Sequence, residues 1–201
     1  MRRKEGNEEM IRKFKKGLAC ALVAALTFAA AAPVTADAAD SPTKAPVTET
    51  KKDVQTTTGG VKATVNTSKN GSATLKAVAK TSKKSVSVGS TVTVNGVKYT
   101  VKTVDAKAFA NCTKATSITL PTTIANIKAS AFTGAKKVKT VVLKSTGAVK
   151  VNKKAFKGVS TKKMTIKVNK KMSKKNYNAL VKALRKAGFK GKIKRTAKSY
   201  K

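Results

Sequence analysis

The chain has 201 residues, and its 45 lysine and arginine side chains outnumber the 8 acidic ones so far that the formal net charge is +37. It contains no histidine, which excludes catalytic arrays and zinc sites built on that residue. Asp105 is the only acidic side chain after residue 53, so paired catalytic carboxylates and calcium sites are excluded there as well. We therefore expect no enzyme, no cofactor, no metal and no small-molecule substrate.

Such an excess of positive charge favours polyanionic partners. Most of the basic residues are lysines, which act as flexible point charges, whereas arginine makes the planar contacts of specific phosphate or base readout. The chain has no tryptophan and three tyrosines, so few rings are available to stack on bases. The composition predicts general attraction to polyanions and makes specific nucleic-acid binding an unfavoured interpretation.

Residues 1–38 have the pattern of a secretory signal peptide, with translation starting at either Met1 or Met10. A basic segment at residues 12–16 precedes an apolar run at residues 18–32, and Ala36-Asp37-Ala38 forms a cleavage site. The alternative is an uncleaved anchor, but the run is short for a span of about 20 residues. We expect a secreted protein without a membrane span after cleavage, retained non-covalently, if at all, at the cell envelope.

After the signal, residues 39–58 are rich in threonine, proline and lysine and are predicted to be a disordered spacer. Residues 59–100 contain short β-rich runs separated by turn signals. Asn95-Gly96, between two alternating apolar runs, predicts a tight hairpin, and Lys69-Asn70-Gly71 predicts another turn. A β unit in this position would cover the open end of a repeat array, so we expect an N-terminal β cap.

Residues 101–171 contain one pattern written three times. An apolar pair spaced by three residues leads to Ala-Phe, and each copy continues into an alternating apolar run. Phe109 and Phe132 are 23 residues apart, and Phe132 and Phe156 are 24 apart. A fixed period in the twenties is typical of a solenoid. We predict a mainly β fold, a short leucine-rich-repeat β-solenoid of about three coils of 23–24 residues.

Side chains alternate between the two faces of a strand, which divides the repeat residues into two sets. The inward set, predicted to form the repeat core with a stacked Ala-Phe ladder, is Ala108, Phe109, Leu120, Ala131, Phe132, Leu143, Ala155, Phe156 and Ile166. The outward set, taken as a candidate binding face, is Thr119, Thr140, Val142, Lys144, Lys163, Thr165 and Lys167. The alternative for the outward set is a solvated face without a dedicated ligand. Cys20 lies in the predicted signal, and Cys112 is interpreted as a small buried residue.

Residues 172–193 predict a C-terminal helix and a short strand residue at Ile193. Ser173 is the expected N-cap, Gly188 the expected stop, and an apolar stripe between them faces one side. A basic amphipathic helix can also lie on a membrane, but the stripe is short, so we expect it to cap the last coil. Residues 194–201 are predicted to be a basic tail.

These residues together resemble the BspA-like leucine-rich repeats of bacterial secreted and cell-surface proteins. The resemblance covers about residues 59–193, and its motifs are Val94-Asn95-Gly96-Val97-Lys98-Tyr99-Thr100-Val101, Ala108-Phe109-Ala110-Asn111-Cys112 and Ile118-Thr119-Leu120-Pro121. It implies a right-handed solenoid of short strands and a role in binding and adhesion, with partners that include host matrix proteins and other cells.

Three hypotheses follow from the sequence. The first is a secreted or cell-surface, non-catalytic adhesion module that binds an anionic surface polymer, or a protein or glycan of a host or neighbouring cell. The second is a cationic membrane-active or nucleic-acid-binding protein on a repeat scaffold. The third is a purely structural repeat protein.

Overall fold

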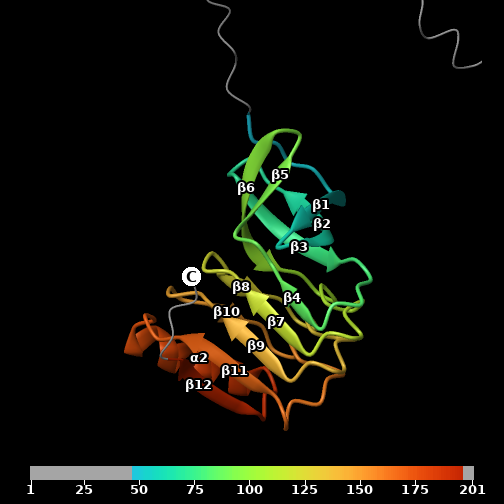
Figure 1. The fold of residues 1–201 in the computed structure, drawn as a ribbon. Helices are drawn as coiled ribbons and strands as arrows, with labels where there is room; N and C mark the ends of the chain where they lie inside the picture. Colours follow the sequence, from blue (N-terminus) through green and yellow to red (C-terminus); the bar gives the residue numbers. More distant parts are fainter. Residues whose placement is uncertain (1–46, 197–201) are drawn as a thin grey trace, which may run out of the picture. The chain divides into compact units, whose positions relative to one another are not determined.

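The computed structural model describes residues 47–196, a mainly β structure with two sheets and the C-terminal helix (Figure 1). The predicted signal peptide, the choice between Met1 and Met10, and residues 39–46 and 197–201 of the predicted spacer and tail lie outside the described residues. The first sheet is ordered β1-β2-β3-β6-β8-β10, with β5 also paired to β6, and the second is ordered β12-β11-β9-β7-β4.

The first sheet begins as antiparallel strands and ends as parallel ones. Antiparallel pairs join β1 (Val54–Thr58) to β2 (Val61–Thr67), β2 to β3 (Ser72–Val78), and β5 (Thr91–Val94) to the first half of β6 (Val97–Val104). β3 then pairs in parallel with the second half of β6. The short strands β8 (Asn126–Ile127) and β10 (Lys150–Val151) then add in parallel beyond β6. The repeats therefore continue a sheet that the N-terminal region has started.

Both predicted turns are confirmed. Asn95 and Gly96 have φ angles of 50° and 76° and join β5 to β6, as a two-residue hairpin with both central residues at positive φ requires. Asn70 and Gly71 lie in the turn between β2 and β3, where the Asn70 side-chain oxygen accepts a hydrogen bond from the Ser72 N–H at 3.1 Å.

The predicted spacer ends too late, because β1 occupies residues 54–58 and pairs in register with β2. The preceding residues are held as well, since the Glu49 N–H donates to the Tyr99 hydroxyl at 2.8 Å and the Thr67 N–H donates to the Lys51 carbonyl at 2.8 Å. These are backbone contacts to distant partners, which the low apolar content of residues 47–58 does not reveal. The boundary placed at residue 100 also falls inside β6.

The second sheet is parallel throughout and contains the strand wall of the repeats. Its members are β4 (Ser85–Ser87), β7 (Ser117–Leu120), β9 (Thr140–Leu143), β11 (Thr165–Asn169) and β12 (Lys192–Thr196). Leu120 lies opposite Leu143, a separation of 23 residues, as predicted.

The predicted alignment of the third repeat strand is wrong by two residues. Ile166 lies opposite Val141, and Val168 lies opposite Leu143. Met164 is buried, but it precedes the strand in a turn where its N–H donates to the Thr161 carbonyl at 3.0 Å. The buried Thr161 and this turn lengthen the approach to β11, so Ile166 is the first buried residue of the strand itself. In the same coil Val149 is buried and Ala148 is exposed.

The Ala-Phe pairs stack through the interior. The Phe109 and Phe132 ring centroids are 5.3 Å apart, and those of Phe132 and Phe156 are 4.8 Å apart with an interplanar angle of 4°. Phe189, which follows the helix, adds a fourth ring at 5.2 Å from Phe156. All nine residues of the proposed repeat core are at most 4% exposed. Stacked rings in a dry core combine apolar burial with favourable ring contacts.

Helix α2 (Lys174–Lys186) packs Leu180 and Leu184 into the core. The expected N-cap forms, since the Ser173 Oγ accepts a hydrogen bond from the Asn176 N–H at 3.2 Å, and the chain leaves the helix at Gly188 with φ 88°. The predicted tail begins too early, because β12 runs to Thr196 in register with β11. The predicted strand residue Ile193 lies opposite Ile166, but the strand extends further than predicted because backbone pairing with β11 continues through the polar residues up to Thr196.

Candidate functional site: the basic face of the repeats

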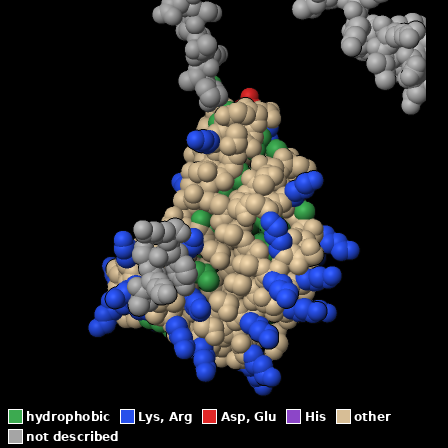
Figure 2. Space-filling model, in the orientation of Figure 1, with side chains coloured by type: hydrophobic (Ala, Val, Ile, Leu, Met, Phe, Trp, Pro, Cys, Tyr) green, Lys and Arg blue, Asp and Glu red, His purple; other side chains and the backbone are tan. Residues whose placement is uncertain are grey.

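Charge is distributed unevenly over the described residues. Residues 47–104 carry 10 basic and 2 acidic side chains, whereas residues 105–196 carry 25 basic side chains and one acidic one. Figure 2 shows the basic side chains gathered around the part of the molecule where Figure 1 places β7, β9 and β11, and few of them on the part that holds β1, β2 and β5. The repeats therefore carry most of the positive charge of the described residues.

Asp105 is the one carboxylate within the repeats, and two lysines hold it. Its carboxylate oxygens lie 3.0 Å from the Lys128 Nζ and 3.5 Å from the Lys76 Nζ. Burial by itself raises the pKa of Asp105, but the hydrogen bond from the Ala106 N–H and the charges of Lys128 and Lys76 outweigh it and hold that pKa below its ordinary value. Asp105 thus links the start of the repeats to β3 through Lys76. No acidic side chain follows Asp105 in the sequence, so the later lysines have no acidic neighbour along the chain.

The outer face of the second sheet brings together most of the predicted binding residues. One row runs Ser117, Thr140, Thr165 across adjacent strands, and the next runs Thr119, Val142, Lys167. Val142 is 8% exposed and lies outside the core cluster, so its neighbours on this face cover it. Lys144 follows Leu143 one position beyond these rows, where its carbonyl accepts a hydrogen bond from the Asn169 side chain at 2.9 Å.

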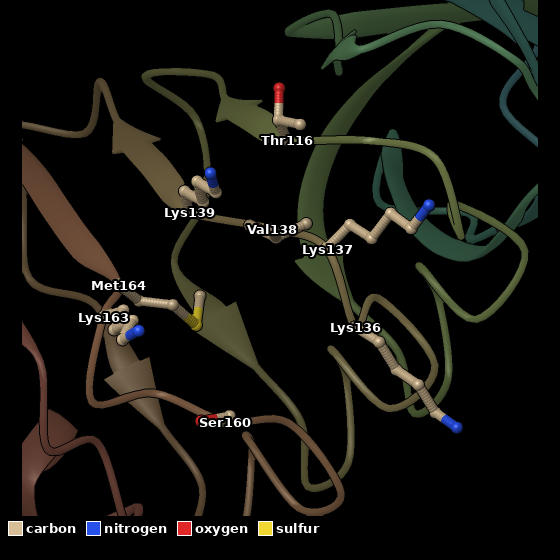
Figure 3. Close-up of a pocket in the computed structure, with 8 residues that line it drawn as sticks. All are labelled: Thr116, Lys136, Lys137, Val138, Lys139, Ser160, Lys163 and Met164. Carbon is tan, nitrogen blue, oxygen red and sulfur yellow. The ribbon is translucent and has the colours of Figure 1, made fainter.

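Lys163 does not belong to this face, because the two-residue shift of the third strand places it before β11. It lines instead a hollow of about 360 Å³ at the edge where the chain enters β9 and β11 (Figure 3). The lining residues are Thr116, Lys136, Lys137, Val138, Lys139, Ser160, Lys163 and Met164.

Sequence reasoning missed this hollow, although a signal for it was present. Lys-Lys pairs at residues 136–137 and 162–163 stand at corresponding places in successive coils, shortly before a strand. Because neighbouring strands are about 4.8 Å apart, equivalent residues of two coils must lie side by side.

Cys112 has no chemical role in this face. It is fully buried, and burial raises the pKa of its thiol to about 11. A thiol in that environment stays protonated at neutral pH and is a poor nucleophile. The Cys112 side chain occupies the turn after Phe109, where its N–H donates to the Phe109 carbonyl at 3.0 Å, and Ala135 occupies the same place after Phe132.

The described residues contain neither a candidate metal-binding group nor a candidate membrane-spanning helix. Between residues 47 and 196, no group of three histidine, cysteine or acidic side chains comes close enough to hold a metal ion. Within the same residues, no helix has both the length and the apolar character needed to cross a membrane.

Comparison with known families assigns the repeats. A family model described as BspA type leucine-rich repeat region matches residues 87–199, which is more than half of the chain. The chain belongs to the BspA-type leucine-rich repeat family. This agrees with the stacked Ala-Phe pairs and the parallel strand wall, and it confirms the resemblance noted from the motifs.

Among solved structures, the BspA-type chain is similar to a leucine-rich cell surface protein from Faecalibacterium prausnitzii. The two share 19% sequence identity with a TM-score of 0.43, over 59% of this chain. The aligned part spans 33% of the length of that protein. A search of curated proteins gives no match.

Proposed function

We propose that this BspA-type chain is an exported, non-catalytic binding module that attaches to anionic polymers through the lysines of its repeats. The observation that carries the proposal is the charge of residues 105–196, with 25 basic side chains and one acidic one. Free lysine ammonium groups attract polyanions at long range and are screened by salt over about 8 Å at physiological ionic strength. The signal-like segment at residues 1–38 supports export.

The way the helix packs supports attachment through the repeats over insertion of the helix into a membrane. Leu180 and Leu184, the centre of the apolar stripe of α2, are 1% and 2% exposed. A helix that lies in a membrane interface needs its apolar face free to enter the lipid. In this chain that face is covered by the last coil, so α2 closes the array and leaves its lysines in solvent.

The test is fractionation of the producing cells, with the envelope washed across a salt series and the protein followed by antibody. We expect release between about 0.2 and 1 M salt, because screening weakens exposed charge contacts. Retention in 1 M salt, or full recovery in the medium at physiological salt, would contradict the proposal.

Two matched triple variants test whether the repeats carry the attachment. The variant K157Q/K171Q/K182Q removes three exposed charges from the repeat and helix region, and K62Q/K69Q/K98Q removes three exposed charges from the N-terminal region. We expect the first to lower the salt concentration of half-release clearly more than the second. Equal effects would assign retention to net charge alone.

A further inference from the structure

The hollow at the entry to β9 and β11 differs from the rest of the basic surface in combining three kinds of group. Val138 and Met164, which are 4% and 2% exposed, form its floor. Thr116 and Ser160 contribute hydroxyl groups, and four lysines stand around it. Figure 3 shows Val138 and Met164 between Thr116 and Ser160, with Lys139 and Lys163 near Met164 and the side chains of Lys136 and Lys137 extending outward.

The lysines of the hollow are available to a ligand. Within residues 47–196 the ion pairs involve Glu49 and Asp105, so no carboxylate there neutralises Lys136, Lys137, Lys139 or Lys163. The Thr116 Oγ1 donates its proton to the Lys84 carbonyl at 3.1 Å, which leaves its lone pairs to accept from a ligand. The hydrocarbon stems of lysines add apolar wall while their ammonium groups stay in water.

We propose that this hollow binds one sugar or polyol unit that carries a single anionic group. The volume of about 360 Å³ is at the lower end of the range for small-ligand sites, which suits a unit of this size. The ammonium groups meet the anion, the hydroxyls meet those of the sugar or polyol, and the lysine stems with Val138 and Met164 cover its C–H groups. The inference rests on the proposed function, because the unit is taken as one repeat of the anionic polymer.

A bare inorganic anion would use only part of the site. Exposed lysines bind small anions weakly, since each contact in high dielectric contributes about 1 kcal/mol or less. The apolar floor offers a contact for C–H groups that an exposed lysine ammonium by itself does not offer. Specificity for a carbon-bearing anion therefore follows from Val138 and Met164, and attraction follows from the lysines.

Two methionines supply an internal test. Met164 lines the hollow, whereas Met172, which is 1% exposed, lies outside its lining. The full exported chain, labelled at its methionine methyl groups, is titrated at 150 mM salt with ribitol 5-phosphate, glucose 6-sulfate, sorbitol and inorganic phosphate. We expect the two charged polyol or sugar probes to shift the Met164 methyl signal saturably and to leave Met172 in place. Sorbitol and inorganic phosphate should produce less than a tenth of that shift at equal concentration.

The outcomes separate the possible sources of the ligand. A stronger response to ribitol 5-phosphate assigns the unit to a phosphate-bearing polymer, and a stronger response to glucose 6-sulfate assigns it to a sulfated glycan. No saturable Met164 shift with either probe, or an equal shift with inorganic phosphate, overturns the proposal.

A pair of double variants tests the lysines directly. K139Q/K163Q neutralises one lysine from each coil of the hollow, and K174Q/K175Q neutralises two exposed lysines on α2 as the matched control. We expect the first to weaken probe binding about fivefold or more and the second less than twofold, in keeping with about 1 kcal/mol for the lost contacts. If both variants weaken probe binding equally, the effect comes from net charge and the proposed binding site is wrong.

Failure here is distinguishable from failure of the proposed function. If the envelope retains the protein in a salt-dependent way but the Met164 signal does not respond to the probes, the proposed binding site is wrong. The proposal of attachment through the repeats is unaffected. If the Met164 signal shifts saturably but the envelope does not retain the protein, the proposed binding site stands. The polymer would then come from a source other than the producing cell.

Discussion

The N-terminal region, residues 47–104, and the repeat region, residues 105–196, are both β structures, but different contacts hold them together. In the first, antiparallel hairpins pair strands that are near neighbours in sequence, as β2 pairs with β3 and β5 with β6, and a parallel pairing of β3 with β6 joins the hairpins. In the second, parallel strands 23 to 25 residues apart pair across whole coils, and stacked phenylalanines fill the interior.

The difference between the two regions shows which positions can carry positive charge without destabilising the fold. Each coil directs its Ala-Phe pair and alternate strand residues into the core. Most positions in its turns face solvent and can therefore be lysine. The single carboxylate, Asp105, lies where the two regions meet and contacts Lys76 of the first and Lys128 of the second. The first region thus supplies the closed end of the array, and the second presents the basic surface.

The largest effect is expected from removing the central ring of the stack. Phe132→Ala leaves a cavity between Phe109 and Phe156, and large-to-small changes of this kind cost about 3–5 kcal/mol in the free energy of unfolding. Val47→Ala, at a position that is 62% exposed, is the control and should be neutral.

Hydrogen exchange of the Phe132→Ala variant shows how far the two regions are independent. If they are, the amides of Ile118 and Val141 lose protection while those of Val65 and Leu75 keep it. Equal loss in both sets would mean that the two regions unfold as one unit and would break the comparison.

A smaller effect is expected from Tyr99→Phe in the N-terminal region. The Tyr99 ring stays buried, but the Glu49 N–H loses its acceptor at 2.8 Å, which costs about 1 kcal/mol. The loss should be local, because the hydroxyl ties residues 47–51 to the sheet. Faster exchange of the Glu49 amide with an unchanged Phe132 environment is the expected result, and an unchanged Glu49 amide would refute the role of the hydroxyl.

Asp105→Asn tests the junction of the two regions. Burial raises the pKa of Asp105, but the hydrogen bond from the Ala106 N–H and the charges of Lys128 and Lys76 outweigh burial and hold that pKa below its ordinary value. The ionised form therefore stabilises the folded state at pH values above the ordinary pKa near 4. That contribution is lost as pH falls through the lowered pKa. We expect the variant to be less stable by about 1 kcal/mol at pH 7.

Thermal unfolding of the Asp105→Asn variant and the parent chain across pH checks the sign. The difference between them should shrink as the pH falls below about 4, because protonation then removes the negative charge of Asp105 in the parent chain and the variant has none at that position. A difference that is constant from pH 7 to pH 2 would show that the ion pairs do not contribute. Asp53→Asn, at an exposed position outside these pairs, is the control.

The smallest effect is expected at the residue before each Ala-Phe pair. Lys107, Ser130 and Lys154 have φ angles of 57°, 60° and 61°, a conformation that non-glycine residues adopt at a cost. Ser130→Gly removes that cost but adds freedom to the unfolded chain, so the net change should lie within about 0.5 kcal/mol. Ser117→Gly, within β7, should destabilise by about 0.5–1 kcal/mol, because no such strain is relieved there. Equal destabilisation in the two variants would show that the turn stores no strain.

Much of the fold could be predicted because its signals are local or periodic. Asn95-Gly96 specifies a hairpin through the backbone preference of two residues, and the repeated Ala-Phe pairs specify coils through their spacing. Ser173 and Gly188 specify the ends of the helix in the same way. The lysine hollow could not be predicted from the candidate binding face. A constant 23-residue period places Lys163 on the strand wall, but the third strand is shifted by two residues, so Lys163 lies before β11.

The sequence by itself determined the repeat architecture, the residues of the core and the concentration of positive charge, because burial pattern, spacing and composition are properties of the chain alone. Only the tertiary structure decided that residues 54–58 form a strand and that the strand predicted at Ile193 extends over residues 192–196, since backbone pairing with β2 and β11 holds these polar segments. It also decided that β11 starts two residues late and that Phe189 completes the ring stack. Those features depend on how one coil meets the next, and that contact exists only once the chain has folded.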